Sequence, residues 1–215
     1  MVEYSTTLTW VIGLAHIRIQ LSPSKGAALM TSSTISSLTG TYTIDASHSQ
    51  IGFTARHLMV TKVRGAFNEF SGGGIIDFET PTNSKAELKI QAASIDTRNA
   101  DRDGHLKGND FFDMEQFPEI AFASTTVVKN GDAYAVTGDL TIKGVTKPVT
   151  VEFDFTGTAV DPWGNTRIGF EGKTTIDRTE WGVNWNTALE AGGVLVSEKI
   201  NLEFELSAIR SADVA

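Results

Sequence analysis

From Gly40 onwards, apolar and polar residues alternate with a period of two over most of the chain. The segment AELKIQA at residues 86–92 shows the pattern clearly, because its apolar residues occupy every second position with Glu, Lys and Gln between them. The same split recurs at residues 134–142, 149–155 and 200–206. Successive side chains of a strand point to opposite faces, so each segment predicts a strand with one buried and one solvated face.

Eight or more such segments follow one another, separated by Gly, Asn, Pro or Asp residues that are typical of turns. Since nothing resembles the long crossovers of a parallel sheet, the sequence predicts an all-β, antiparallel fold. Closure into an extended eight-stranded barrel would remove the exposed edges of an open sheet, and a β-sandwich is the alternative. Such a barrel is either filled by its own side chains or holds one slender ligand. Small residues at expected inward positions favour the second arrangement: Ala86, Ala92, Gly138 and Gly172.

The alternation stops once, between Ser94 and Phe122, where a compact and charged segment replaces it. Asn99 is typical of a helix N-cap, and Asp101 and Asp103 suit the first turn of a helix. Gly108 predicts a left-handed residue at the end of this short helix insert. We expect the following apolar residues to anchor the insert to the barrel, where it covers a hydrophobic interior: Leu106, Phe111, Phe112, Met114 and Phe117.

The charge balance argues against a nucleic-acid partner. The chain carries 26 acidic and 18 basic residues, a formal net charge of -8, and its Lys and Arg residues are scattered along the sequence. It has no cysteine, which excludes disulfides, a thiolate nucleophile and a Cys-based zinc site. No apolar run reaches the roughly 18 residues of a transmembrane helix, so we expect no transmembrane segment.

Residues 1–38 differ in pattern from the rest, and they end in a Ser/Thr tract typical of a linker. We expect them to form an N-terminal extension, disordered or outside the barrel, and residues 39–210 to form the barrel domain. The first apolar run carries Glu3 in place of a basic start, so export is the less expected outcome. Translation from Met30 would give a cytoplasmic protein. The run VIGLAHIRIQL could supply a homodimer contact.

Three polar residues, Asp45, Ser47 and His48, are of the types found in serine hydrolases. In an extended segment Ser47 and His48 would point in opposite directions, and no nucleophile-elbow pattern is present. A structural role is therefore expected, with no catalytic residue. His48, His57 and His105 show no recognised ligand spacing, so no metal site is expected either.

Two other polar residues are candidates for contact with a ligand. His57 shares its strand face with Phe53, which would direct it into the barrel, where it could meet a polar head group. Arg178, in the segment IDRTEWG, is expected to form a salt bridge that holds the following turn, and a role as a polar gate is the alternative.

Several segments resemble the YceI-like family of bacterial lipid-binding proteins in order and spacing. The quoted segments are YTIDASHSQIGFTARHLMVTKVRGAFNEFSGG, AASIDTRNADRDGHLKGNDFFDMEQFPEIAFAST, YAVTGDLTIKGVTKPVTVEFDF and IDRTEWGVNWN. The resemblance covers residues 39–209. It implies a lipocalin-like barrel, a helix beside the barrel mouth and a long apolar tunnel that holds a polyisoprenoid or a similar chain.

From these observations we expect a non-catalytic protein that binds a long-chain isoprenoid or a fatty amphiphile and needs no cofactor. An enzyme acting on a hydrophobic substrate and a structural barrel without a ligand are the alternatives. The residues expected to contact the ligand are Phe53, His57, Phe67, Leu88, Ile90, Ala92, Val136, Leu140, Val151, Phe153, Phe170, Arg178, Trp181, Ile200 and Phe204.

Overall fold

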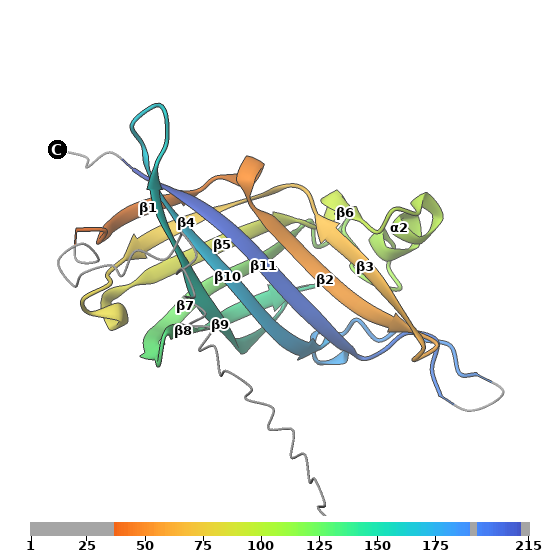
Figure 1. Cartoon of the computed structure of the whole chain (residues 1–215). Helices are drawn as coiled ribbons and strands as arrows, with labels where there is room; N and C mark the ends of the chain where they lie inside the picture. The colour runs from red at the N-terminus through yellow and green to blue at the C-terminus, as the bar shows by residue number, and fades with distance from the viewer. Residues whose placement is uncertain (1–36, 190–192, 212–215) are drawn as a thin grey trace, which may run out of the picture. The chain divides into compact units, whose positions relative to one another are not determined.

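The computed structural model describes residues 37–189 and 193–211, which form eleven β-strands and one α-helix (Figure 1). The strands are β1 (Gly40–Ile44), β2 (Gln50–His57), β3 (Thr61–Phe67), β4 (Phe70–Ile76), β5 (Lys85–Gln91), β6 (Ile95–Asp96), β7 (Glu119–Asn130), β8 (Ala133–Ile142), β9 (Val145–Val160), β10 (Thr166–Asp177) and β11 (Lys199–Arg210). The helix is α2 (Ala100–Lys107), and four short 3-10 helices are η1 (Ala46–His48), η2 (Pro81–Asn83), η3 (Ala92–Ser94) and η4 (Arg178–Trp181).

The sheet closes on itself. In the described part of the chain, β1, β4, β5, β7, β8, β9, β10 and β11 are hydrogen-bonded in that order, and β1 also pairs with β11. The closing register sets Tyr42 opposite Arg210 and Ile44 opposite Ala208. All of these pairs are antiparallel, which confirms the predicted eight-stranded barrel and excludes the sandwich.

A hairpin of β2 and β3 extends the barrel at one end. β2 continues along the edge of β11 beyond β1, because Gln50–Thr54 pairs with Asn201–Glu205. β3 pairs with β2 on one side and with the short β6 on the other. Figure 1 shows α2 at this same end, beside β3 and β6.

The helix insert is built as the sequence predicts, with one exception. Asn99 caps α2 by accepting a hydrogen bond from the backbone N–H of Arg102 at 2.9 Å, and Asp103 accepts one from the backbone N–H of Thr97 at 2.9 Å. The prediction of a left-handed Gly108 is wrong: its φ is -73° and its ψ is 177°, which is extended backbone. The helix ends in extended backbone at Gly108, a conformation that any residue can adopt. The backbone conformation therefore does not require glycine at this position.

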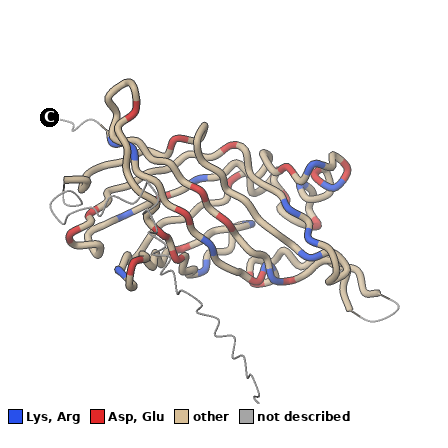
Figure 2. The backbone as a smooth tube through the Cα atoms, viewed as in Figure 1, with Lys and Arg blue, Asp and Glu red and all other residues tan. Residues whose placement is uncertain are grey.

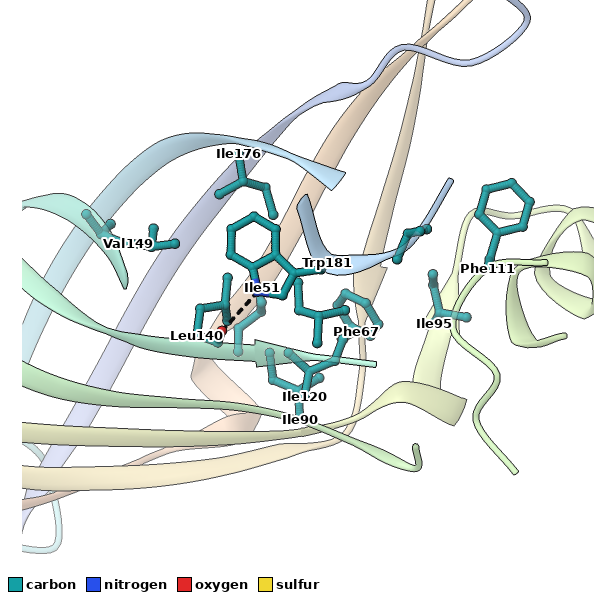
Figure 3. Packing of buried hydrophobic residues seen from close by; sticks show 13 residues of the cluster. Ile51, Phe67, Ile90, Ile95, Phe111, Ile120, Leu140, Val149, Ile176 and Trp181 are labelled. Atoms are coloured by element: carbon teal, nitrogen blue, oxygen red, sulfur yellow. Dashed lines mark hydrogen bonds between the residues drawn. The ribbon is translucent and has the colours of Figure 1, made fainter. Parts of the chain in front are cut away.

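The described residues form two hydrophobic clusters in the interior. The larger one includes Phe67, Phe111, Leu140, Ile176 and Trp181, and Figure 3 shows these side chains between the barrel wall and the helix insert. The other cluster contains Leu38, Tyr42, Phe78, Ile168 and Ala208. The core therefore gathers in two groups rather than one.

The predicted N-terminal extension falls mostly on residues 1–36, which lie outside the described residues. Leu38, its last residue, is buried in the second cluster, and its carbonyl accepts a hydrogen bond from the Tyr42 hydroxyl at 2.7 Å. Leu38 thus packs with residues of the barrel strands.

Candidate functional site

A cavity of about 290 Å³ lies inside the barrel. Its lining comes from strands around the barrel, from α2 and from the residues that follow α2, and nearly all of it is apolar. It reaches both hydrophobic clusters, from Tyr42 and Ile168 of one to Phe111 and Ile176 of the other. This volume is near the lower limit of pockets that hold small molecules, roughly 300 to 1,000 Å³. A slender chain suits it better than a broad ring system.

Most of the predicted contact residues line this cavity, although contact with a ligand itself stays a prediction. They are Phe53, Phe67, Leu88, Ile90, Val136, Leu140, Val151, Phe153, Phe170, Arg178, Ile200 and Phe204. Three predicted residues are not among the lining residues: His57, Ala92 and Trp181.

Each of these three has another environment. His57 ends β2 and forms an isolated bridge with Val196, outside the barrel ring. Ala92 is buried, but it follows the end of β5, and its backbone N–H bonds the carbonyl of Pro118 at 2.8 Å. Trp181 packs in the larger cluster, with its indole directed at the wall (Figure 3).

Two of the small positions expected to leave room are covered by phenylalanine rings. A Cβ atom added to Gly138 would lie 2.4 Å from Cζ of Phe122, and one added to Gly172 would lie 2.4 Å from Cδ1 of Phe153. These rings lie over the glycines and are themselves part of the cavity lining. Gly138 and Gly172 therefore make room for neighbouring side chains, and of the four small positions only Ala86 is among the lining residues.

The sequence reasoning missed several lining residues. Ile120 and Phe122 belong to the alternating segment EIAFAST, and Ile168 to RIGFEG, so the same period-two signal could have found them. Leu106, Phe111 and Phe112 were expected only as anchors of the insert, yet they also line the cavity. The other apolar lining residues that the sequence reasoning missed include Tyr42, Ile44, Ile51, Ala55, Ile76, Phe78, Ile95, Ala121, Val127, Tyr134, Ile142, Val149, Ile176, Val183, Val196, Leu202, Leu206 and Ala208.

Among the described residues, three charged ones line the cavity, Asp77, Glu87 and Arg178, and of these Arg178 is buried. It is 6% exposed, and its Nε donates to the carbonyl of Ser197 at 3.0 Å while Nη1 donates to the carbonyl of Val183. No carboxylate of the described residues forms an ion pair with it, so the turn is held by hydrogen bonds to carbonyls and not by the predicted salt bridge. Burial lowers the pKa of Arg178, an effect that the nearby charges of Glu198 and Asp177 oppose.

The second terminal nitrogen of Arg178, Nη2, is buried and has no hydrogen-bond partner. A buried donor without a partner is costly, and more so when it belongs to a charged group. The guanidinium carbon lies 5.9 Å from the centroid of the Phe111 ring, so an aromatic face is also close to it. Arg178 thus lines the cavity and also carries a buried hydrogen-bond donor without a partner.

The cluster of Asp45, Ser47 and His48 differs from expectation in geometry. The segment forms η1 instead of an extended strand, which brings Ser47 Oγ to 3.0 Å from His48 Nδ1. The same Nδ1 also faces Asp45 Oδ2 at 2.8 Å, whereas a catalytic triad uses the two ring nitrogens separately. Hydrogen bonds from Ser47, Arg167 and His48 hold the pKa of Asp45 well below its usual range. The cluster therefore fixes the turn between β1 and β2.

No group of three or more His, Cys, Asp or Glu side chains in the described residues could hold a metal ion. Among the helices of that same part of the chain, none is long and apolar enough to cross a membrane.

The chain is similar in sequence to known bacterial proteins. A UPF0312 protein of Photorhabdus laumondii is 42% identical over 158 residues, which cover 73% of this chain and 81% of that protein. A UPF0312 protein of Yersinia pestis is 41% identical over 165 residues, which cover 76% of this chain and 85% of that protein.

Solved structures share the fold. Burkholderia cenocepacia BcnA superimposes with a TM-score of 0.68 at 26% identity, covering 76% of this chain and 98% of its own. The Campylobacter jejuni YCEI protein gives a TM-score of 0.63 at 28% identity, covering 73% and 90%. A polyisoprenoid binding domain from Saccharophagus degradans gives 0.60 at 17% identity, covering 79% and 98%, a likeness of fold alone.

A family model also matches most of the chain. The YceI-like domain model matches residues 42–208. This range begins in β1 and ends in β11, the two strands whose pairing closes the barrel. The chain therefore belongs to the YceI-like domain family.

Proposed function

We propose that this protein binds one long-chain isoprenoid or a similar amphiphilic lipid inside the barrel, for storage or transport and without chemical conversion. The observation that carries the proposal is the apolar cavity, whose lining reaches both hydrophobic clusters. Burial of each methylene group contributes about 0.8 kcal/mol, so a chain of a few isoprene units has sufficient driving force without any specific polar contact. The description of the Saccharophagus domain as polyisoprenoid binding is consistent with such a cargo.

The unequal ends of the cavity suggest how an amphiphile would lie. Arg178 stands at the end that includes Phe111 and Val183, whereas the other end is lined by Tyr42 and Ile168. A head group with hydrogen-bond acceptors would complete the bonding of Arg178 Nη2. The apolar tail would then extend towards the second cluster.

Native mass spectrometry of the full purified chain tests the proposal. We expect a co-purifying lipid, or uptake of one fluorescent polyprenyl phosphate per protein by the delipidated chain. The substitution Ala86→Phe places a ring in the cavity lining and should abolish uptake, whereas the exposed Lys89→Ala should leave it unchanged.

Circular dichroism serves as the control for folding in both variants. A folded wild type that takes up no lipid would favour the structural barrel. Undiminished uptake by a folded Ala86→Phe variant would place the lipid outside the cavity.

A further inference from the structure

The tip of the β2–β3 hairpin exposes three consecutive large apolar residues. Leu58, Met59 and Val60 are 42%, 54% and 77% exposed. Such residues are uncommon in neighbouring positions on a soluble surface unless they contact another surface.

The backbone of this tip is strained for the residues that it carries. The N–H of Val60 bonds the carbonyl of His57 at 3.1 Å, and the two residues between them, Leu58 and Met59, have φ values of 54° and 59°. A two-residue turn with positive φ at both positions favours Asn and Gly. Folding alone would therefore favour other residues at the tip, and strain of this kind is found at functional sites.

Positive charge surrounds the apolar tip. Arg56 and Lys62 are direct cross-strand partners, and Arg64 follows two residues later on the same face. All three are exposed, and no carboxylate of residues 37–189 or 193–211 forms an ion pair with them. Like charges directly opposite each other destabilise a strand pair, and an external anion would relieve this repulsion.

The charge continues into a polar groove of about 760 Å³ beside the hairpin. Lys62 and Arg64 line this groove together with Arg98 and Arg102, and among the described residues of its lining Asp96 is the one acidic residue. Figure 2 shows Lys and Arg gathered along β2 and β3, in a chain whose formal net charge is -8.

The tip also adjoins one end of the cavity. The backbone N–H of Leu58 bonds the carbonyl of Leu195 at 2.8 Å, and His57 bridges to Val196. Val196, which takes part in this bridge, lines the cavity, and so does Ala55, which lies two residues before His57 on β2. A surface that binds the tip would thus lie near the cavity end that contains Arg178.

We propose that the β2–β3 hairpin docks the barrel onto an anionic lipid bilayer. The apolar tip enters the boundary between head groups and acyl chains, and Arg56, Lys62 and Arg64 bind lipid phosphates. This goes beyond cargo binding, because it concerns the outside of the barrel and can be tested whether or not the cavity is occupied.

The chain supplies a matched control at another hairpin. The β9–β10 tip exposes Val160 by 70% and Trp163 by 80%. Its charged groups are paired with each other, because Arg167 Nε donates to Asp161 Oδ2 at 3.0 Å. This tip has apolar exposure without an excess of positive charge.

The test is flotation of the full chain with vesicles of phosphatidylcholine and phosphatidylglycerol in equal parts, compared with phosphatidylcholine alone. We expect binding to the anionic vesicles only. The double substitution Leu58→Asn with Met59→Gly should weaken binding roughly tenfold or more while keeping or raising the melting temperature, because it relieves the strained turn. Arg56→Gln with Lys62→Gln should weaken binding to a similar degree and reduce its salt dependence.

Trp163→Ser should leave vesicle binding unchanged. The proposal is overturned if the wild type does not float with anionic vesicles, if the Leu58→Asn, Met59→Gly variant binds as well as the wild type, or if Trp163→Ser weakens binding equally. Lipid uptake measured in detergent solution, without vesicles, should be the same for all of these variants. Loss of uptake there would concern the cavity and not the docking surface.

Discussion

The indole Nε1 of Trp181 donates a hydrogen bond to the backbone carbonyl of Leu140 at 2.9 Å (Figure 3). Trp181 belongs to η4, which directly follows β10, and Leu140 belongs to β8, so the bond fastens the turn after β10 to another strand of the barrel. The turn that it fixes also contains Arg178, and the position of the buried guanidinium thus depends on this contact.

Trp181→Phe should lower the free energy of unfolding by about 2 kcal/mol, since it leaves a buried carbonyl without this donor and opens a small void. Urea unfolding followed by circular dichroism measures the change. Trp163→Phe is the matched control, because Trp163 is 80% exposed and its replacement should have little effect. Equal effects of the two substitutions would show that the Trp181 contact is not stabilising.

Arg178→Met should weaken binding of a polyprenyl phosphate about ten- to a hundredfold, the range expected for a hydrogen bond to a charged group. Binding of the corresponding polyprenol should change much less, because an alcohol carries no negative charge. Fluorescence titration with both lipids measures the ratio of the two affinities. The same loss for both lipids would mean that the substitution damages the cavity and that Arg178 does not select the head group.

Gly138→Leu should destabilise the barrel by about 1 to 3 kcal/mol, because the new side chain overlaps the Phe122 ring. Gly104→Ala is a control in α2, where an added Cβ atom meets nothing within 4 Å. That substitution should stabilise the helix by about 0.5 to 1 kcal/mol. Thermal unfolding of both variants checks the two signs, and a stable Gly138→Leu variant would show that Phe122 moves aside easily.

The stability of the barrel should fall in acid through Asp161. Hydrogen bonds, chiefly from Asn165, lower its pKa from 3.8 to about 2. An aspartate with a lowered pKa in the folded state stabilises that state above the pKa of the unfolded chain, and this stabilisation is lost as the pH falls towards 2. The melting temperature of the wild type should therefore fall more steeply between pH 4 and pH 2 than that of Asp161→Asn; parallel curves would contradict this.

The period-two pattern was sufficient for the barrel and for much of its lining. Val136 and Leu140 line the cavity because β8 keeps one face inward along its length. The same reasoning failed for His57, where β2 has already entered the hairpin, and for Ala92, where β5 has ended. Alternation gives the face of a residue but not the point at which its strand leaves the barrel wall.

Other features depend on contacts between distant parts of the chain. The Phe122 ring, on β7, covers Gly138 on β8. The register that places these two residues near each other depends on how the strands pair, and it cannot be predicted from the sequence of either segment. Likewise, Lys62 and Arg98 are scattered in the sequence, yet both line one groove. The unpartnered nitrogen of Arg178 could not be foreseen, since the carbonyl acceptors of its other nitrogens come from the turns that surround it.

The pairing of Tyr42 with Arg210 joins the first strand of the barrel to its last. A ribosome must therefore release almost the whole domain before the ring can close, and contacts so far apart in sequence are slow to form. Until β11 arrives, β10, β1 and β2 all lack a neighbour on one edge. The nascent chain thus has several unpaired edges at once, which makes the period before β11 leaves the ribosome the time when a chaperone would protect it most from aggregation.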